Sequence, residues 1–154
     1  MSSAPAWLMQ IDRLSRVALG QLELVHIIPS PEYVEIPKSH DYCNRVVLWN
    51  KKIIPVMDIS MLVNRVPSYI ENNAVAVAIY RDKNTEDIKY GGIQLTDMPI
   101  LESVDNSQAV SKSELPDKWD MVSISCFQMS ENEIVPVLDV RRLFSTGISS
   151  MYYQ

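Results

Sequence analysis

Two cysteines and two histidines are among the residues of this chain that could act as nucleophiles, general bases or metal ligands. Cys43 and Cys126 lie far apart in the sequence, without the CxxC or cysteine–histidine spacing of a zinc site. His40 stands close to Cys43, but a lone pairing at so short a separation does not fix the geometry of a catalytic dyad. His26 has no second ligand at metal-binding spacing. We therefore expect no metal, no cofactor and no catalytic residue, and a reducing compartment fits the cysteine usage better than a disulfide framework does.

Two aspartates could carry acid–base chemistry, but their surroundings predict a structural role. Asp58 lies in "IIPVMDISMLV", residues 53–63, and Asp139 lies in "IVPVLDVRRLF", residues 134–144. In both copies an apolar run ends at the aspartate, whose carboxylate can accept hydrogen bonds from the first free amides of a helical turn. Each copy therefore predicts a strand, a capping aspartate and one or two helical turns. A leucine four residues after the aspartate is expected to pack the helical turn against the strands.

The adjacent Gly91 and Gly92 lie in "KYGGIQL", without the GxGxxG or GxxxxGK[ST] context of a phosphate-binding loop. We expect them to permit a tight turn or a bulge. An enzyme that uses Cys43 or Asp58 is accordingly the weaker hypothesis for this chain.

The elements around these residues are predicted to be strands. Short runs rich in valine and isoleucine recur about every ten residues, bounded by proline, asparagine, aspartate and serine, which is typical of an all-β sandwich or barrel. The run at 73–80 is apolar on both faces, which indicates a central strand or one that borders a groove. The clearest predicted strands are Arg45 to Trp49, Lys52 to Met57, Asn73 to Tyr80, Ile88 to Leu95, Met121 to Met129 and Glu133 to Leu138.

The polar segments between these strands predict the connections. Residues 81–87 suggest a hairpin turn, residues 105–120 a long polar loop, and residues 64–73 a link between two lobes. The repeated segment occurs twice, which excludes a short-period solenoid and indicates equivalent strands in two similar lobes. We predict an all-β fold with short helices: a single domain over residues 1–154, built from two small β-barrel lobes that are connected near residues 64–73.

Composition and charge exclude several classes of partner. Hydrophobic residues make up 47% and charged residues 21% of the chain, close to globular averages. The net charge of -5 divides into +1 over residues 1–70 and -6 over residues 71–154, so neither half offers the basic surface that nucleic acid requires. No apolar run approaches the roughly 18 to 20 residues of a membrane span, and the start of the sequence does not read as a signal peptide. We expect a cytoplasmic protein with no nucleic-acid partner and no membrane insertion.

The repeat, the strand pattern and the lack of catalytic motifs together resemble the CheW-like domain family, the adaptor fold of bacterial chemotaxis and related systems. Residues 22–59, "LELVHIIPSPEYVEIPKSHDYCNRVVLWNKKIIPVMDI", follow the family's "V.EI" segment, "..IP..P" turn and "G(V)(I)NLRG.I(V)P(V)(I)DL" motif. The later segments "AVAIY", "YGGIQLTDMPILESV" and "EIVPVLDVRRLF" match more loosely a strand, the "(V)GL.VD.V..V" segment and the closing "ILD(I)..LL". The resemblance extends over nearly the whole chain.

The resemblance implies two intertwined, SH3-like, five-stranded β-barrels and a protein that performs no chemistry. Such proteins bridge the cytoplasmic tip of a chemoreceptor to the regulatory domain of a CheA-type histidine kinase, in chemotaxis or in type IV pilus (twitching) signalling. The receptor helix lies in a groove between the lobes, and one barrel end meets the kinase. The positions of this sequence that the resemblance assigns to partner binding are Leu24, His26, Arg45, Asn50, Val75 and Met98.

Several of these positions depart from the family pattern. His26 replaces the usual glutamate, Arg45 the usual glycine, and Trp49-Asn50-Lys51 stands where the family has "LRG". Asparagine cannot reproduce the charge or the planar donors of arginine, which argues against receptor binding of the ordinary kind. The loss of glycine at 45 and 51 predicts a different turn. The alternative function is a small β-barrel that binds a peptide or ligand outside chemosensory signalling, with the strand at 73–80 lining its site.

Overall fold

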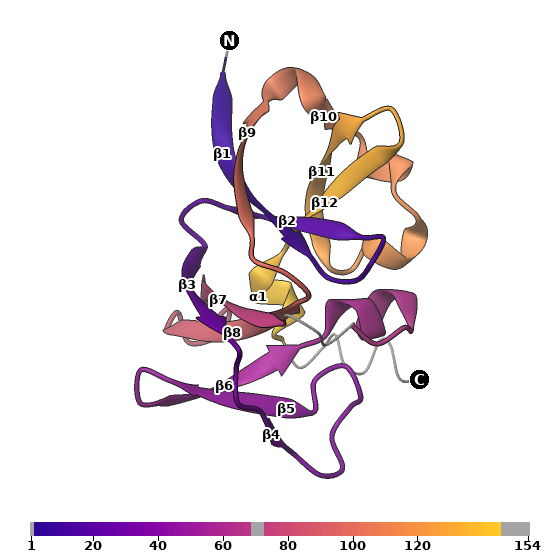
Figure 1. Cartoon of the computed structure of the whole chain (residues 1–154). Coiled ribbons are helices and arrows are strands. Elements are labelled where there is room, and N and C mark those ends of the chain that lie inside the picture. Colours follow the sequence, from indigo (N-terminus) through magenta and orange to yellow (C-terminus); the bar gives the residue numbers. More distant parts are fainter. Residues whose placement is uncertain (1, 69–72, 146–154) are drawn as a thin grey trace.

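The computed structural model describes residues 2–68 and 73–145, which form two β-sheets and a few short helical turns (Figure 1). The predicted all-β fold with short helices is confirmed. The strands are β1 (Ser3–Gln10), β2 (Arg16–Gly20), β3 (Leu24–Pro29), β4 (Val34–Glu35), β5 (Arg45–Trp49), β6 (Lys52–Met57), β7 (Ala74–Arg81), β8 (Ile88–Leu95), β9 (Ile100–Asp105), β10 (Ala109–Val110), β11 (Ser123–Ser130) and β12 (Glu133–Leu138). The helical turns are Ser60–Asn64, Asn106–Gln108, Lys112–Glu114, Asp117–Trp119 and α1 (Val140–Leu143).

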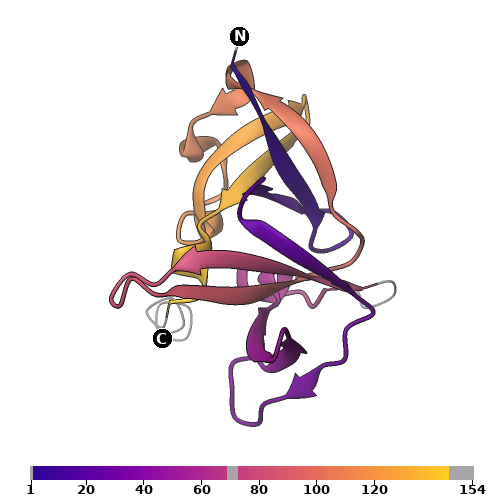
Figure 2. The ribbon, with the colours of Figure 1, turned by 90° about the vertical axis from the view of Figure 1, so that its left-hand side faces the viewer.

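Each sheet contains six strands and forms one lobe of the molecule. Sheet A has the order β10-β11-β12-β2-β1-β9, and sheet B has the order β3-β7-β8-β6-β5-β4. Figures 1 and 2 show sheet A above sheet B, with α1 where the two lobes meet. Five strands per lobe were expected; the sixth strand is the two-residue β10 in sheet A and the two-residue β4 in sheet B.

The two sheets match strand for strand. Sheet B contains a parallel pair, β6 beside β8, in which Val56 lies opposite Gly92. Sheet A contains the corresponding pair, β12 beside β2, in which Val137 lies opposite Ala18. Val56 and Val137 occupy the same position in the repeated segment. The duplication therefore extends over β1–β6 and β7–β12, and each half contributes its first hairpin to the sheet of the other half.

This exchange places the lobe-to-lobe connections elsewhere than expected. The chain changes sheet between β2 and β3 and again between β8 and β9. The segment 64–73 instead joins β6 to β7 inside sheet B, and its residues 69–72 lie outside the described part of the chain. Proline and polar residues identify a connecting segment, but they do not specify which strands it connects.

Four of the six predicted strands have the predicted bounds, and β7 and β11 begin and end one or two residues later. β7 is confirmed as a central strand, because it lies between β3 and β8 and its residues 74–78 are buried. Residues 74–78 are therefore closed to a ligand, whereas the half-buried Ile79 and Tyr80 at the end of the strand line a surface pocket. The hairpin turn predicted at 81–87 is also confirmed, since Arg81 pairs with Ile88.

The main hydrophobic core lies between the sheets and includes residues from both. Leu62 and Leu143, the equivalent leucines of the repeat, are both fully buried in it, as predicted. Separate small clusters fill the interior of each lobe. The repeated segments therefore supply the contacts that hold the two lobes together.

Gly91 and Gly92 lie within β8 and form neither a turn nor a bulge, because neither has a positive φ. A Cβ atom at position 91 would lie 2.3 Å from the ring of Phe144, and one at position 92 would lie 2.8 Å from Cγ1 of Val75. The glycines thus allow close packing on both faces of the strand.

Candidate functional site

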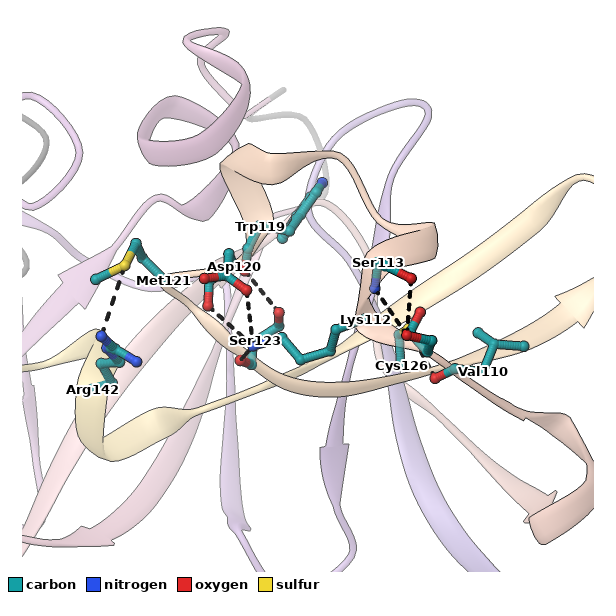
Figure 3. Close-up of polar contacts among 10 residues, drawn as sticks. Val110, Lys112, Ser113, Trp119, Asp120, Met121, Ser123, Cys126 and Arg142 are labelled. Atoms are coloured by element: carbon teal, nitrogen blue, oxygen red, sulfur yellow. Dashed lines mark hydrogen bonds and ion pairs between the residues drawn. The ribbon is translucent and has the colours of Figure 1, made fainter.

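The two thiols are protonated structural groups. Burial raises the pKa of the Cys43 thiol, and burial with the nearby Glu114 carboxylate raises that of Cys126. The Cys126 Sγ lies 3.6 Å from the carbonyl oxygen of Val110 and 3.5 Å from that of Ser111 (Figure 3). A protonated thiol is a weak nucleophile, so the sulfur chemistry that catalysis or metal binding requires is not favoured at either position.

Both aspartates of the repeat cap a helical turn, as predicted. Asp58 accepts a hydrogen bond from the Met61 N–H at 3.1 Å, and Asp139 accepts one from the Arg142 N–H at 3.2 Å. Asp58 is also buried and accepts bonds from the backbone N–H and the hydroxyl of Ser68. Both oxygens of the Asp58 carboxylate therefore accept hydrogen bonds that stabilise the fold.

Leu24 and His26 are the predicted partner positions on β3. His26 is the exposed one of the two, and its ring lies in a cluster of aromatic side chains. Its ring lies 5.7 Å from that of Trp49, and the Trp49 ring lies 5.2 Å from that of Tyr90 in an edge arrangement. The Lys52 ammonium group lies 6.0 Å from the centre of the Tyr90 ring. We call His26, Trp49, Lys52 and Tyr90 the aromatic surface. Rings with an adjacent cation can receive apolar, aromatic or acidic side chains from a partner.

Asn50 lies beside the aromatic surface, in the two-residue turn between β5 and β6. Asn50 has a φ of 51° and Lys51 a φ of 63°, so both adopt the left-handed conformation of a tight hairpin turn. Position 51 thus adopts a conformation that suits glycine although its residue is lysine. Asparagine tolerates it well, whereas lysine adopts it at a cost.

The side chain of Arg45 packs against other residues of the lobe that sheet B forms. It lies in β5, where its guanidinium group donates a hydrogen bond to Gln94 Oε1 and stands 4.2 Å from the centre of the Tyr33 ring. Arg45 has no positive φ, so no glycine is needed for the backbone here. The arginine fills the interior of the lobe and does not form part of the turn.

The remaining predicted positions are spread over the fold. Leu24 is half-buried and packs against the main core, and Val75 is fully buried, so it cannot touch a partner. Met98 is 53% exposed in the segment that joins β8 to β9. The structure thus brings His26 and the Asn50 turn close together, with Val75 in the cluster beneath the Trp49 ring, whereas Leu24 packs against the main core. Sequence reasoning missed Trp49, Lys52 and Tyr90 as site residues, because their meeting depends on the pairing of separate strands.

Within residues 2–68 and 73–145, no group of histidine, cysteine and carboxylate side chains is arranged to hold a metal ion. In the same part of the chain, no helix has the length and apolar character needed to cross a membrane.

Comparison with known proteins identifies the family and the fold. Residues 10–147 match the CheW-like domain family. Among solved structures, the fold is similar to that of the scaffolding protein TtCheW from Thermoanaerobacter tengcongensis, with a TM-score of 0.77, 9% sequence identity and 94% of each chain covered. Comparison with curated protein sequences gives no match.

Proposed function

The chain belongs to the CheW-like domain family, and from this premise we propose that it is a non-catalytic adaptor of the cytoplasm that couples chemoreceptors to a CheA-type histidine kinase. The pathway would be chemotaxis or type IV pilus signalling. The regulatory domain of the kinase and the cytoplasmic tip of the receptor are its proposed partners. Both contacts would be made by protein surfaces alone.

The observation that supports this proposal is the aromatic surface, in which the exposed His26 ring lies beside the half-buried Trp49 and Tyr90. His26 and the Asn50 turn stand where the family pattern has its receptor-contacting glutamate and arginine, and the fold brings them together on sheet B. The thiols and the repeat aspartates have structural roles, which leaves contact surfaces as the means of action. The buried Val75 belongs to the cluster against which Trp49 and Tyr90 pack and would support this surface from below.

Binding to the kinase is the first test. Isothermal titration of the purified chain with the regulatory domain of the cognate kinase should show a 1:1 complex with a Kd on the order of micromolar, as for other transient signalling contacts. The absence of heat and of co-elution at tens of micromolar would exclude the proposed kinase coupling.

Binding to the receptor is the second test. The departures from the family pattern allow it to be made with variants that restore the family residues. The triple variant His26→Glu, Asn50→Arg and Lys51→Gly restores the family residues at position 26 of the aromatic surface and in the turn beside it. A bidentate arginine and a restored carboxylate should increase the affinity for a receptor-tip helical bundle by about tenfold or more. The matched control carries Lys51→Gly alone and should leave that affinity unchanged. Equal binding by the triple variant and the control would remove this surface as the receptor contact.

A further inference from the structure

The outward face of β4, β5 and β6 is an apolar surface that residues 2–68 and 73–145 leave largely uncovered: Val34, Leu48 and Ile53 are exposed, and Val46 and Pro55 between them are half-buried. Leu48 and Ile53 are cross-strand neighbours and are 74% and 75% exposed. Val46 precedes Leu48 by two residues and lies on the same face of β5. It pairs with Val34 of β4 and with Pro55 of β6, and Val34 is 61% exposed. A contiguous exposed apolar patch of this kind is unusual on a monomer and marks a contact surface. We call it the β4–β6 face, made of Val34, Val46, Leu48, Ile53 and Pro55.

The duplication provides an internal comparison, because sheet A contains the same face. The pairing of Val46 with Pro55 and of Leu48 with Ile53 recurs in sheet A as Cys126 with Pro136 and Gln128 with Ile134. Val34 opposite Val46 recurs as Val110 opposite Cys126. In sheet A, however, Cys126 and Pro136 are buried, and Val110 and Ile134 are half-buried against the main core.

A segment of the chain itself covers this face in sheet A. Leu115 and Trp119 are buried and belong to the same cluster as Cys126. The Lys112 ammonium group donates a hydrogen bond to the carbonyl oxygen of Ser123 at 2.8 Å. The Ser123 hydroxyl donates one to the carbonyl oxygen of Trp119 at 2.7 Å (Figure 3). These contacts hold Lys112 to Asp120, which we call the cover segment, against β11. The polar loop predicted at 105–120 thus contains three short helical turns and the strand β10, and its second half has an apolar side.

Sheet B has no such cover in the described chain. Tyr42 corresponds to Val122, because the carbonyl oxygens of both accept a bond from the N–H of the repeat aspartate. The residues between β4 and Tyr42 bury no leucine or tryptophan, and Ile36 there is 42% exposed. Within residues 2–68 and 73–145, nothing takes the place of the cover segment on the β4–β6 face, which leaves the face open to a partner.

Charge indicates which kind of molecule. The cover segment, "KSELPDKWD", carries three acidic and two basic residues around its leucine and tryptophan. The β4–β6 face ends at a hairpin tip that carries the exposed Lys51. A basic rim beside an apolar patch favours an acidic, apolar ligand.

We propose that the β4–β6 face binds a short helical segment of a partner protein, which presents a leucine and an aromatic side chain between acidic residues. The bound segment would occupy sheet B as the cover segment occupies sheet A. This face is distinct from the aromatic surface, because Leu48 and Ile53 alternate along their strands with Trp49 and Lys52 and so point to the opposite side of the sheet. The proposal does not depend on coupling to a kinase.

A synthetic peptide with the sequence of the cover segment, blocked at both ends, is the probe. We expect its addition to the ¹⁵N-labelled chain, up to about 1 mM, to shift the amide signals of Val34, Val46, Leu48 and Ile53 in a saturable manner, with a Kd on the order of 0.1 to 1 mM for so short a peptide. A peptide with serine in place of its leucine and tryptophan should cause no shift.

Two variants of the protein locate the binding. Leu48→Asp with Ile53→Asp should weaken it by at least tenfold. Ile124→Asp changes an apolar residue of sheet A that is 62% exposed, and it should leave binding unchanged. No shift at 1 mM, or shifts confined to β11 and β12 because the peptide displaces its own copy, would overturn the proposal. So would signals of the β4–β6 face that shift with protein concentration alone, because the occupant would then be a second copy of the chain.

Discussion

Replacing the two equivalent aspartates of the repeat by alanine should have unequal effects on stability. Asp139→Ala removes one capping bond, that from Arg142 N–H, which costs about 1 kcal/mol. Asp58→Ala removes the same capping bond from Met61 N–H and also the acceptor of the Ser68 N–H at 3.2 Å, in a buried place. A buried N–H without an acceptor costs roughly 1–3 kcal/mol more.

We therefore expect a loss of about 2–4 kcal/mol for Asp58→Ala and about 1 kcal/mol for Asp139→Ala. The Ser68 hydroxyl adds little to the difference, because it also lies 2.8 Å from the carbonyl oxygen of Ile11 and can donate there instead. The loss of stability for Asp58→Asn should fall between these values. The side-chain oxygen of asparagine can still accept the hydrogen bond from the Met61 N–H, but its NH₂ group would face the Ser68 N–H, which is also a donor.

Urea unfolding followed by tryptophan fluorescence measures all three variants on one scale. In thermal unfolding, the loss for Asp58→Ala corresponds to a fall in Tm of about 4–16 °C, against about 2–4 °C for Asp139→Ala. Equal losses for the two alanine variants would refute the reasoning, because the repeat would then contain two caps of the same kind.

Three further predictions concern single positions. Lys51→Gly should raise stability by about 0.5–1 kcal/mol in urea unfolding, because glycine relieves the left-handed backbone; Lys51→Ala keeps the Cβ atom and should change nothing. Gly91→Ala should lower stability by about 1–3 kcal/mol, since the new methyl group meets Phe144, and a smaller loss when combined with Phe144→Ala would identify that contact as the cause. The pKa of Asp12 is lowered: burial alone would raise it, but the hydrogen bonds that surround the carboxylate outweigh burial. A lowered pKa stabilises the fold above the ordinary value of 3.8, and this contribution is lost as the pH falls below it, so Asp12→Asn should be less stable than the native chain at pH 7 and equally stable near pH 2.

The elements that a local pattern specifies could be predicted from the sequence. Alternation of apolar residues located the strands, and the aspartates of the repeat located two helical turns, because both signals depend on neighbours along the chain. The repeat also predicted two similar lobes. It could not reveal that the first hairpin of each half joins the sheet of the other half, because that exchange leaves no local trace.

The site could be predicted in part, for the same reason. His26 and Asn50 were placed by their family positions and are exposed, whereas Val75 is buried once β7 lies between two other strands. The cover segment was predicted as a polar loop because its two apolar residues stand among charged ones, and their burial depends on β11 and β12 lying beneath them.

The measurement that tests the central claim most directly is the formation of a three-component complex. Sedimentation velocity of a receptor-tip helical bundle with the kinase regulatory domain should show the two associated when the chain is present and separate when it is omitted. The account predicts one faster-sedimenting species that contains all three proteins. Separate sedimentation in the presence of the chain, or displacement of one partner by the other, would contradict the proposed role as an adaptor.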